Sequence, residues 1–321
     1  AGLAMGFGRI GDAQAKSGMI DLAALDKRAL HETGMDVLKN SSRVAVPSYR
    51  FGVVMRSGIS ASGDAGNVSM EASAELVGLS LEQMRRIAGL CLADFVAQIQ
   101  ASGRTVVPSS DVVASSGYRK IEPSPIPFVK KPFADARTVA IVAPEGMPLV
   151  SQHSDAPSSD KSPMSLGNWR AINQMCVDLS CVVLIPTLVI DFAELSGSGH
   201  SVFGGSASVG VKPGLFLVPI STYVSAHYAK IALAGPGGKM ILEQRVAIGQ
   251  AGDFVKTSTV GNRAEVEWWN AMASNSSSDA GRPTRAFEMS AYEYRVEPEA
   301  FSQAALAGAQ AMHRQYAAAA L

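Results

Sequence analysis

The side chains that could hold a metal ion are scattered along the chain. His153 and Asp155 lie two residues apart, whereas His200 and His227 lie much further on. A zinc site needs three or four His, Cys or carboxylate ligands that converge on one point. This spacing gives neither a helical pair nor a short ligand motif. We therefore interpret these residues as loop histidines, and we expect no metal and no cofactor.

Gly235-Pro-Gly-Gly-Lys239 has part of the pattern of a phosphate-binding loop. That loop requires Gly, four further residues and then Gly-Lys followed by Ser or Thr. Leu233 occupies the position of the first Gly, and Met240 occupies the Ser/Thr position. The segment also lies between two predicted strands, whereas a phosphate loop precedes a helix. The sequence therefore favours a hairpin turn over nucleotide binding.

The sequence offers no clear nucleophile or acid–base pair. Gly197-Ser-Gly199 and Gly204-Gly-Ser206 lack the Gly-x-Ser-x-Gly pattern of a nucleophile elbow. The neighbouring carboxylates are typical of a solvated surface and give no glycosidase pair: Glu265 with Glu267, and Glu297 with Glu299. The sequence therefore predicts no catalytic residue.

Two further segments could contact a ligand or a partner. Trp268, Trp269, Tyr292 and Tyr294 could form an aromatic ligand platform, but packing against a sheet is the simpler interpretation. The loop Ser196 to Ser208 is rich in glycine and lies between strands. It could reach a partner or a membrane, or it could be only a hairpin tip.

Composition limits the class of protein. The chain has 321 residues, of which 47% are hydrophobic and 17% charged, and its formal net charge is +0. This balance gives no reason to expect a nucleic-acid partner, because such proteins usually carry a basic excess. A weakly charged surface suits an assembled protein better than a free monomer. The odd, low number of three cysteines indicates buried free thiols. The alternative for Cys176 and Cys181 is a disulfide bond between them.

Any functional site must be positioned by the secondary structure of the chain. The most prominent part of that structure is a strand-rich stretch from Cys181 to Gly249. Its predicted strands are Cys181 to Phe192, Val209 to Val224, Tyr228 to Ala234 and Lys239 to Ile248. Strand Cys181 to Phe192 is apolar on both faces. In the last strand Met240, Leu242, Val246 and Ile248 alternate with polar residues, as in a half-buried strand.

The remaining segments alternate between helical and extended patterns. Ser80 to Ser102 is the strongest helix, because Ser80 and Gln83 form a capping box and Gly103 is placed to end it. The helix and Thr105 to Pro108 form a βαβ-type unit, which predicts parallel strand pairing. The other expected elements are an arm at 1 to 20; helices at Asp21 to Lys39, Leu166 to Leu179, Ala264 to Ala273 and Glu299 to Leu321; strands at Arg43 to Met55, Asn67 to Leu76, Arg137 to Val142 and Arg285 to Val296; an extended run at Ile121 to Pro132; and loops at Gly58 to Gly66, Ser151 to Pro163 and Asn275 to Arg282.

These elements predict an α/β fold: a mixed, mostly antiparallel sheet with two packed helices and a C-terminal helix. We expect three parts, with an N-terminal arm and short helix at 1–40, a main domain at 41–250 and a C-terminal extension at 251–321. No run of 18 apolar residues exists, so no transmembrane helix is expected.

The order of elements resembles a known family. Ala93-Asp-Phe-Val-Ala-Gln-Ile99, Ser102 to Ser109, the helix ending at Ser180 and the glycine-rich runs after Phe192 are similar to the periplasmic domain of the curli secretion channel CsgG and the TolB N-terminal domain. The likeness covers residues 43 to 250, and Ile185-Pro186 departs from the family's usual Gly. The resemblance implies a ring-like outer-membrane assembly and no enzyme activity.

The leading hypothesis is a non-enzymatic structural or assembly component of a bacterial cell envelope, in the periplasm or associated with the outer membrane. It would form a homo-oligomer through the arm and the sheet loops, and it would contact other envelope proteins and the outer membrane. A periplasmic protein that binds a lipid or apolar ligand is the first alternative. A hydrolase of unrecognised type is the second.

Overall fold

The computed structural model describes residues 18–39, 41–63, 68–130, 137–151, 164–199, 207–229, 237–262, 266 and 286–319. The fold is mixed α/β, as the sequence predicts. A 15-stranded sheet contains the path β1-β15-β12-β11-β4-β5-β17-β16, and a small sheet pairs β7 with β10. The predictions for the arm at residues 1–17 and for most of Tyr228 to Ala234, Ala264 to Ala273 and the loops Ser151 to Pro163 and Asn275 to Arg282 lie outside the described residues.

The strands of the large sheet differ widely in length. They are β1 (Met19–Asp21), β2 (Leu30–Thr33), β3 (Arg43–Ala45), β4 (Arg50–Gly63), β5 (Val68–Val77), β6 (Thr105–Val106), β8 (Phe128–Lys130), β9 (Thr138–Val142), β11 (Val182–Gly199), β12 (Ala207–Leu217), β13 (Tyr223–His227), β14 (Gly238–Leu242), β15 (Arg245–Gly249), β16 (Gly252–Gly261) and β17 (Ala286–Val296). The small sheet consists of β7 (Pro123–Ser124) and β10 (Leu149–Val150).

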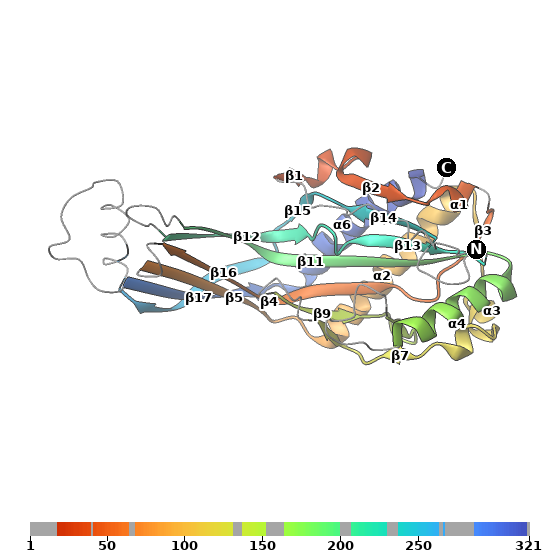
Figure 1. Cartoon of the computed structure of the whole chain (residues 1–321), viewed down its shortest axis with the longest axis horizontal. Helices are drawn as coiled ribbons and strands as arrows, with labels where there is room; N and C mark the ends of the chain where they lie inside the picture. The colour runs from red at the N-terminus through yellow and green to blue at the C-terminus, as the bar shows by residue number, and fades with distance from the viewer. Residues whose placement is uncertain are drawn as a thin grey trace, which may run out of the picture.

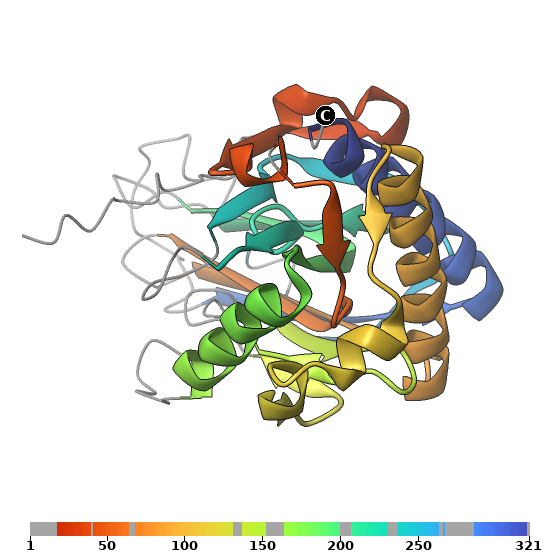
Figure 2. The same cartoon turned by 90° about the vertical axis from the view of Figure 1, so that its right-hand side faces the viewer.

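Helices cover both faces of the wide end of the sheet. They are α1 (Asp36–Lys39), α2 (Leu81–Ala101), α3 (Ser109–Ala114), α4 (Met164–Leu179) and α6 (Pro298–Ala319), with 3-10 turns η1 (Leu22–Ala24), η2 (Lys27–Ala29) and η4 (Tyr118–Lys120). The long helices α2 and α6 lie side by side on one face, and α4 lies on the other (Figure 2). The predicted helices at 80–102, 166–179 and 299–321 are therefore confirmed, as is the capping box of Ser80 with Gln83.

Strand β11 separates the two cores. Val182 and Leu184 belong to the core beneath α2 and α6, whereas Val183 and Ile185 belong to the core beneath α4. Successive side chains of a strand point to opposite faces, so a strand between two cores must be apolar at every position. The apolar character of both faces of this run, noted from the sequence, therefore reflects packing between two cores.

Several strands of the sheet extend beyond the helices (Figure 1, left). They are β4, β5, β11, β12, β16 and β17. Strand β11 has 18 residues and spans about 60 Å at a rise of roughly 3.3 Å per residue. Small apolar side chains fill the interior of this projecting part, and they are Ala61, Val68, Ala207, Val266 and Ala286.

Several predicted loops are paired strands in this projecting part. Gly58 to Gly66 was expected to be a loop, but β4 continues to Gly63 and pairs with β5. Ser196 to Gly199 likewise pairs with β12. A Cβ atom on Gly197 would lie 3.2 Å from Ile59 Cδ1, so small residues here let two layers of strands approach closely. The Ser- and Gly-rich composition of these described residues reflects close packing of strands, whereas residues 200–206 of the second segment lie outside the described residues.

The N-terminal prediction is also wrong. Residues 21–39 form two 3-10 turns, β2 and the short α1 instead of one helix. Strand β2 pairs with β14, and Gly34 has a φ of +61°. Pairing with the sheet outweighs the helical propensity of this segment, and its Leu25 and Ala29 are buried.

Strand boundaries also differ in the central stretch. Val209 to Val224 is interrupted after Leu217, where Ile220 has a φ of 65°. Lys239 to Ile248 is split into β14 and β15, although its four alternating apolar residues are buried as expected. In the βαβ-type unit, β6 does pair in parallel, but its partner is β3 and not the adjacent β5.

We expect Gly117→Ala to lower the free energy of unfolding by about 2 kcal/mol, because an added methyl group would overpack a rigid contact. A Cβ atom at Gly117 would clash with the backbone nitrogen of Met175 in α4. Gly89 in α2 is the matched control, because nothing lies within 4 Å of its added Cβ. Gly89→Ala should leave stability unchanged or raise it by about 0.5–1 kcal/mol. Urea unfolding measures both variants, and equal stability of the two would contradict the expectation.

Candidate functional site

The sheet divides into two layers at one point along β11. The parallel pairing of β11 with β4 ends at Ile190 and Val53. Beyond this point β11 pairs with β12 and β4 pairs with β5. The β11–β12 register shifts between Asp191 and Ala193, so the split coincides with a bulge. Backbone groups at such a split need new hydrogen-bond partners.

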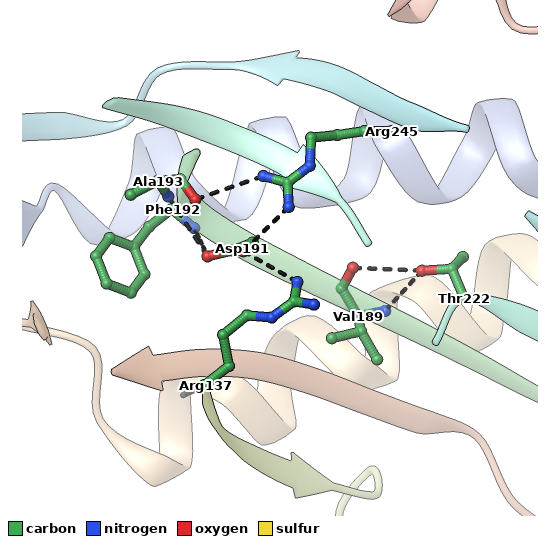
Figure 3. A network of polar contacts seen from close by, with 7 residues as sticks. All are labelled: Arg137, Val189, Asp191, Phe192, Ala193, Thr222 and Arg245. Carbon is green, nitrogen blue, oxygen red and sulfur yellow. Dashed lines mark hydrogen bonds and ion pairs between the residues drawn. The ribbon is translucent and has the colours of Figure 1, made fainter. Parts of the chain in front are cut away.

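The Asp191 carboxylate supplies some of these partners. Its Oδ1 accepts hydrogen bonds from the backbone N–H groups of Phe192 at 2.9 Å and Ala193 at 3.4 Å. Its Oδ2 lies 3.5 Å from Arg137 Nη1 and 3.7 Å from Arg245 Nη2. Figure 3 shows the two arginines reaching this oxygen from opposite sides. Burial raises the pKa of Asp191, while the two guanidinium groups act in the opposite direction.

The two arginines come from different strands of the sheet. Arg245 begins β15, and Arg137 directly precedes β9. Arg245 also donates to the Ala193 carbonyl at 3.4 Å, and its guanidinium lies 5.3 Å from the centre of the Phe216 ring. The side chains of Arg137 and Arg245 are 27% and 18% exposed, whereas Asp191 is only 2% exposed. The cluster therefore ties three strands together at the split.

A cavity of about 160 Å³ lies beside this cluster. Its lining residues come from β4, β11, β15 and the start of β9, and they are Ser57, Gly58, Ile59, Arg137, Asp191, Ala193, Leu195 and Arg245. This lining contains no cysteine, histidine or lysine that could serve as a nucleophile or base. Asp191 already accepts hydrogen bonds from the backbone, so the geometry does not present it as a general base.

A second polar cluster resembles a catalytic relay. Asp94 Oδ2 lies 2.7 Å from His313 Nδ1, and His313 Nε2 lies 2.9 Å from the Tyr49 hydroxyl oxygen. Tyr49 and His313 both have 0% exposure, which leaves no path for a substrate. Burial raises the pKa of Tyr49 well above its usual value, so the phenol stays protonated. The relay therefore joins α2 and α6 to the segment before β4, and its histidine and tyrosine are not accessible to a substrate.

The predicted loop histidines are only partly described. His153, Asp155 and His200 lie outside the described residues. His227 is not on a loop but at the end of β13, only 1% exposed, with its Nε2 3.2 Å from Ser225 Oγ. Within the part of the chain that the structure describes, no group of three or more His, Cys, Asp and Glu side chains could hold a metal ion.

The predicted glycine turn at 235–238 lies partly outside the described residues, as does most of the strand expected before it, so the hairpin stays a prediction. Strands β13 and β14 pair antiparallel, with Ala226 opposite Gly238. Lys239 places its ammonium group 3.9 Å from the centre of the Tyr223 ring, which is a cation–π contact. Gly235 itself lies outside the described residues.

The remaining predicted groups have structural roles where they are described. Glu297 and Glu299 are exposed, and Glu299 pairs with Arg86 at 2.8 Å. Tyr292 stacks on Phe254 with ring centres 5.0 Å apart, and the Tyr294 hydroxyl accepts a hydrogen bond from the Ala251 N–H. The other acidic and aromatic candidates lie outside the described residues: Glu265, Glu267, Trp268 and Trp269.

The cysteines are free and buried, as the simpler interpretation predicted. Burial raises the pKa of Cys91 and Cys176 to about 12 and that of Cys181 to about 11. A thiol with such a pKa is a poor nucleophile at neutral pH.

Sequence reasoning missed the cluster around Asp191. The signal was present, because Asp191 is the only charged residue between Cys181 and Ala193. A lone carboxylate in a strand buried on both faces needs a partner. Nothing in the sequence, however, indicated that Arg137 and Arg245 would be its partners.

Comparison of the chain with protein-family models, curated proteins and solved structures finds no match. Among the described residues, no helix is both long enough and apolar enough to span a membrane. The function must therefore be argued from the geometry of the chain.

We expect Asp191→Asn to lower the free energy of unfolding by about 3 kcal/mol, because it leaves two guanidinium groups without their carboxylate. The amide oxygen of Asn can still accept the backbone hydrogen bonds, so the substitution isolates the charge. Asp253→Asn is the matched control, because Asp253 is exposed on β16. It should change stability by less than about 0.5 kcal/mol. Urea unfolding distinguishes the two, and equal losses would contradict the assigned role.

We also expect stability to fall as the pH is lowered. Burial lowers the pKa of His227 to about 4, from an ordinary value of 6.5. The unfolded chain therefore binds a proton first, so stability is fully present above pH 6.5 and is lost as the pH falls towards 4. This histidine contributes up to about 3 kcal/mol to the loss. Burial also lowers the pKa of His313, so it adds to the effect in the same direction.

His227→Gln should reduce this pH dependence without removing it. Urea unfolding of both proteins at a series of pH values between neutrality and about pH 5 measures the difference. A variant with the same pH dependence as the original protein would show that His227 does not titrate in this way.

Proposed function

We propose that the protein is a non-enzymatic structural component that assembles with further copies of itself through its projecting strands. The observation that carries the proposal is the absence, among the described residues, of a partner strand along the outer edges of β12 and β16, which end the two layers. Strand β16 pairs only with β17, and β12 pairs with β15 only from Leu215 onward. Residues 208–214 of β12 and strand β16 thus each have one edge without a partner strand among the described residues. Such an edge is a template for pairing with another chain.

The sequence does little to protect the outer parts of these edges. Residues 207–211 of β12 and 257–261 of β16 contain no charged residue and no proline. Proteins usually block edge strands with Lys, Pro or an inward-pointing charge. Here Lys212, Pro213 and Lys256 lie only at the inner end of these segments. The unprotected part of each edge is therefore the part furthest from the helices.

An exposed apolar strip accompanies the β16 edge. Val260, Phe287 and Met289 are 58%, 41% and 47% exposed. Val260 lies opposite Met289 in the β16–β17 register, and Phe287 lies two residues before Met289, so all three share one face. Burial of this strip against another copy would add apolar surface to the backbone pairing.

The two edges differ, so pairing of β12 of one copy with β16 of the next would be head to tail. Such contacts give a ring if the rotation closes and a filament if it does not. The zero net charge of the chain fits such an assembly, because copies do not repel one another strongly. A bacterial cell-envelope location is part of the proposal, supported by the order of elements that resembles the CsgG and TolB domains.

The alternative functions have less support. Residues 183–190 are buried on both faces by the two cores and the neighbouring strands, so their apolar side chains are occupied by packing within the chain. Among the described residues, the cavity beside Asp191 is lined by the Ser57 hydroxyl but by no histidine, cysteine or lysine that could activate it. Neither a ligand carrier nor a hydrolase is favoured by a specific contact.

We expect Val260→Lys to weaken self-association, because it places a charge on the unprotected part of the β16 edge. The dissociation constant between copies should rise at least about tenfold. Val177→Lys is the matched control, because Val177 is 57% exposed on α4, away from both edges. Sedimentation velocity and light scattering over a series of protein concentrations measure the association. A monomer at every concentration, or equal weakening by both substitutions, would refute the proposal.

A further inference from the structure

We propose that the cavity at the split of the sheet binds a small oxyanion, carrying a phosphate or carboxylate group, between Arg137, Arg245 and Ser57. This site is separate from the strand edges and does not depend on the assembly proposed above. Four features support it: the charge of the lining, the looseness of its ion pairs, a buried hydroxyl without a partner, and the size of the space.

The cavity lining carries more positive than negative charge. Arg137 and Arg245 face the single carboxylate of Asp191, and the other lining residues are uncharged. Both guanidinium groups approach the same oxygen atom, Asp191 Oδ2, and its other oxygen accepts backbone hydrogen bonds. Within the described lining the two guanidinium groups therefore meet one carboxylate, so the lining as a whole is attractive to an anion.

The ion pairs with Asp191 are long. The nitrogen–oxygen distances of 3.5 and 3.7 Å exceed the roughly 2.7–2.9 Å of a strong charge-assisted hydrogen bond. The remaining contact of Arg245 with an oxygen atom is also long, at 3.4 Å to the Ala193 carbonyl. A guanidinium group has five N–H donors in a planar fork that fits the oxygens of carboxylate and phosphate. The loose pairing leaves Arg245 able to bind a better-placed oxyanion.

Ser57 provides an independent observation. It lies on β4, is 2% exposed and lines the cavity. Its Oγ has no hydrogen-bond partner among the described residues. A buried hydroxyl without a partner is costly, and an oxyanion in the cavity would accept its hydrogen bond. Because Ser57 and Asp191 lie on opposite sides of the split, the anion would link the two layers.

The space is suitable for such a group. A cavity needs roughly 10–15 Å³ to hold one water molecule. The volume of about 160 Å³ therefore accommodates a phosphate or a carboxylate with some water. The partial exposure of both arginine side chains provides access from solvent.

The first test is thermal unfolding and isothermal titration calorimetry of the full chain with inorganic phosphate or acetate, at an ionic strength held constant with chloride. We expect saturable binding and a rise in Tm with concentration for at least one oxyanion, because a ligand of the native state stabilises it. Comparison of the two anions identifies which group the site prefers. An equal effect of chloride, or no saturable effect of either oxyanion, would overturn the proposal.

The second test distinguishes a role of Ser57 in anion binding from a role in stability. Ser57→Ala removes a hydroxyl that has no partner, so the Tm without anion should stay the same or rise. The Kd for the oxyanion should increase about tenfold. Ser60→Ala, at an exposed position of the same strand, is the matched control and should leave the Kd unchanged. An unchanged Kd for Ser57→Ala would refute the assignment of this hydroxyl to the site.

The third test concerns the charge. Arg245→Gln should weaken oxyanion binding by more than tenfold and make it less sensitive to salt. Because this variant also loses contacts with β11, its Tm without anion must be measured beside its Kd. Binding as tight as in the unsubstituted protein would show that the anion does not contact Arg245.

Discussion

The hydrogen bonding of one long strand is the constraint on which the rest of the structure depends. Strand β11 must satisfy its backbone groups over 18 residues while its neighbours change. It pairs with β3, β13 and β4 where the helices cover the sheet, and with β12 beyond that point. Asp191 stands where the change occurs and accepts hydrogen bonds from the next two backbone N–H groups. Its bulge divides one sheet into two facing layers.

The projecting part can exist because its interior is built from small side chains. Alanine and glycine residues such as Ala61 and Gly197 let the layers approach without the help of a helix. The same choice limits the apolar area that the projecting part buries by itself. In the part of the chain that the structure describes, it leaves strand edges without a partner strand and an apolar strip on the outside, and a second copy could cover both.

Burial decides what the polar clusters can do. The Asp94–His313–Tyr49 relay has the hydrogen-bond order of a catalytic group, but its histidine and tyrosine are enclosed in the core. The Asp191 cluster has a less familiar composition, yet its arginines reach solvent and border a cavity. Residue types alone would make the Asp94–His313–Tyr49 relay the stronger candidate for a functional site. The structure favours the Asp191 cluster, because accessibility to solvent is a property of the packed chain.

The sequence by itself determined the local elements with strong periodic signals. The capped helix α2, the alternating strand β5 and the apolar strand β11 follow from side-chain spacing, which reports burial directly. Only the tertiary structure decided which segments pair. The Gly- and Ser-rich ends of β4 and β11 became strands, and residues 21–39 did not become one helix, because distant strands supply their hydrogen bonds. The site around Asp191 was decided in the same way, since its arginines are 54 residues away on either side in sequence and meet only across the folded sheet.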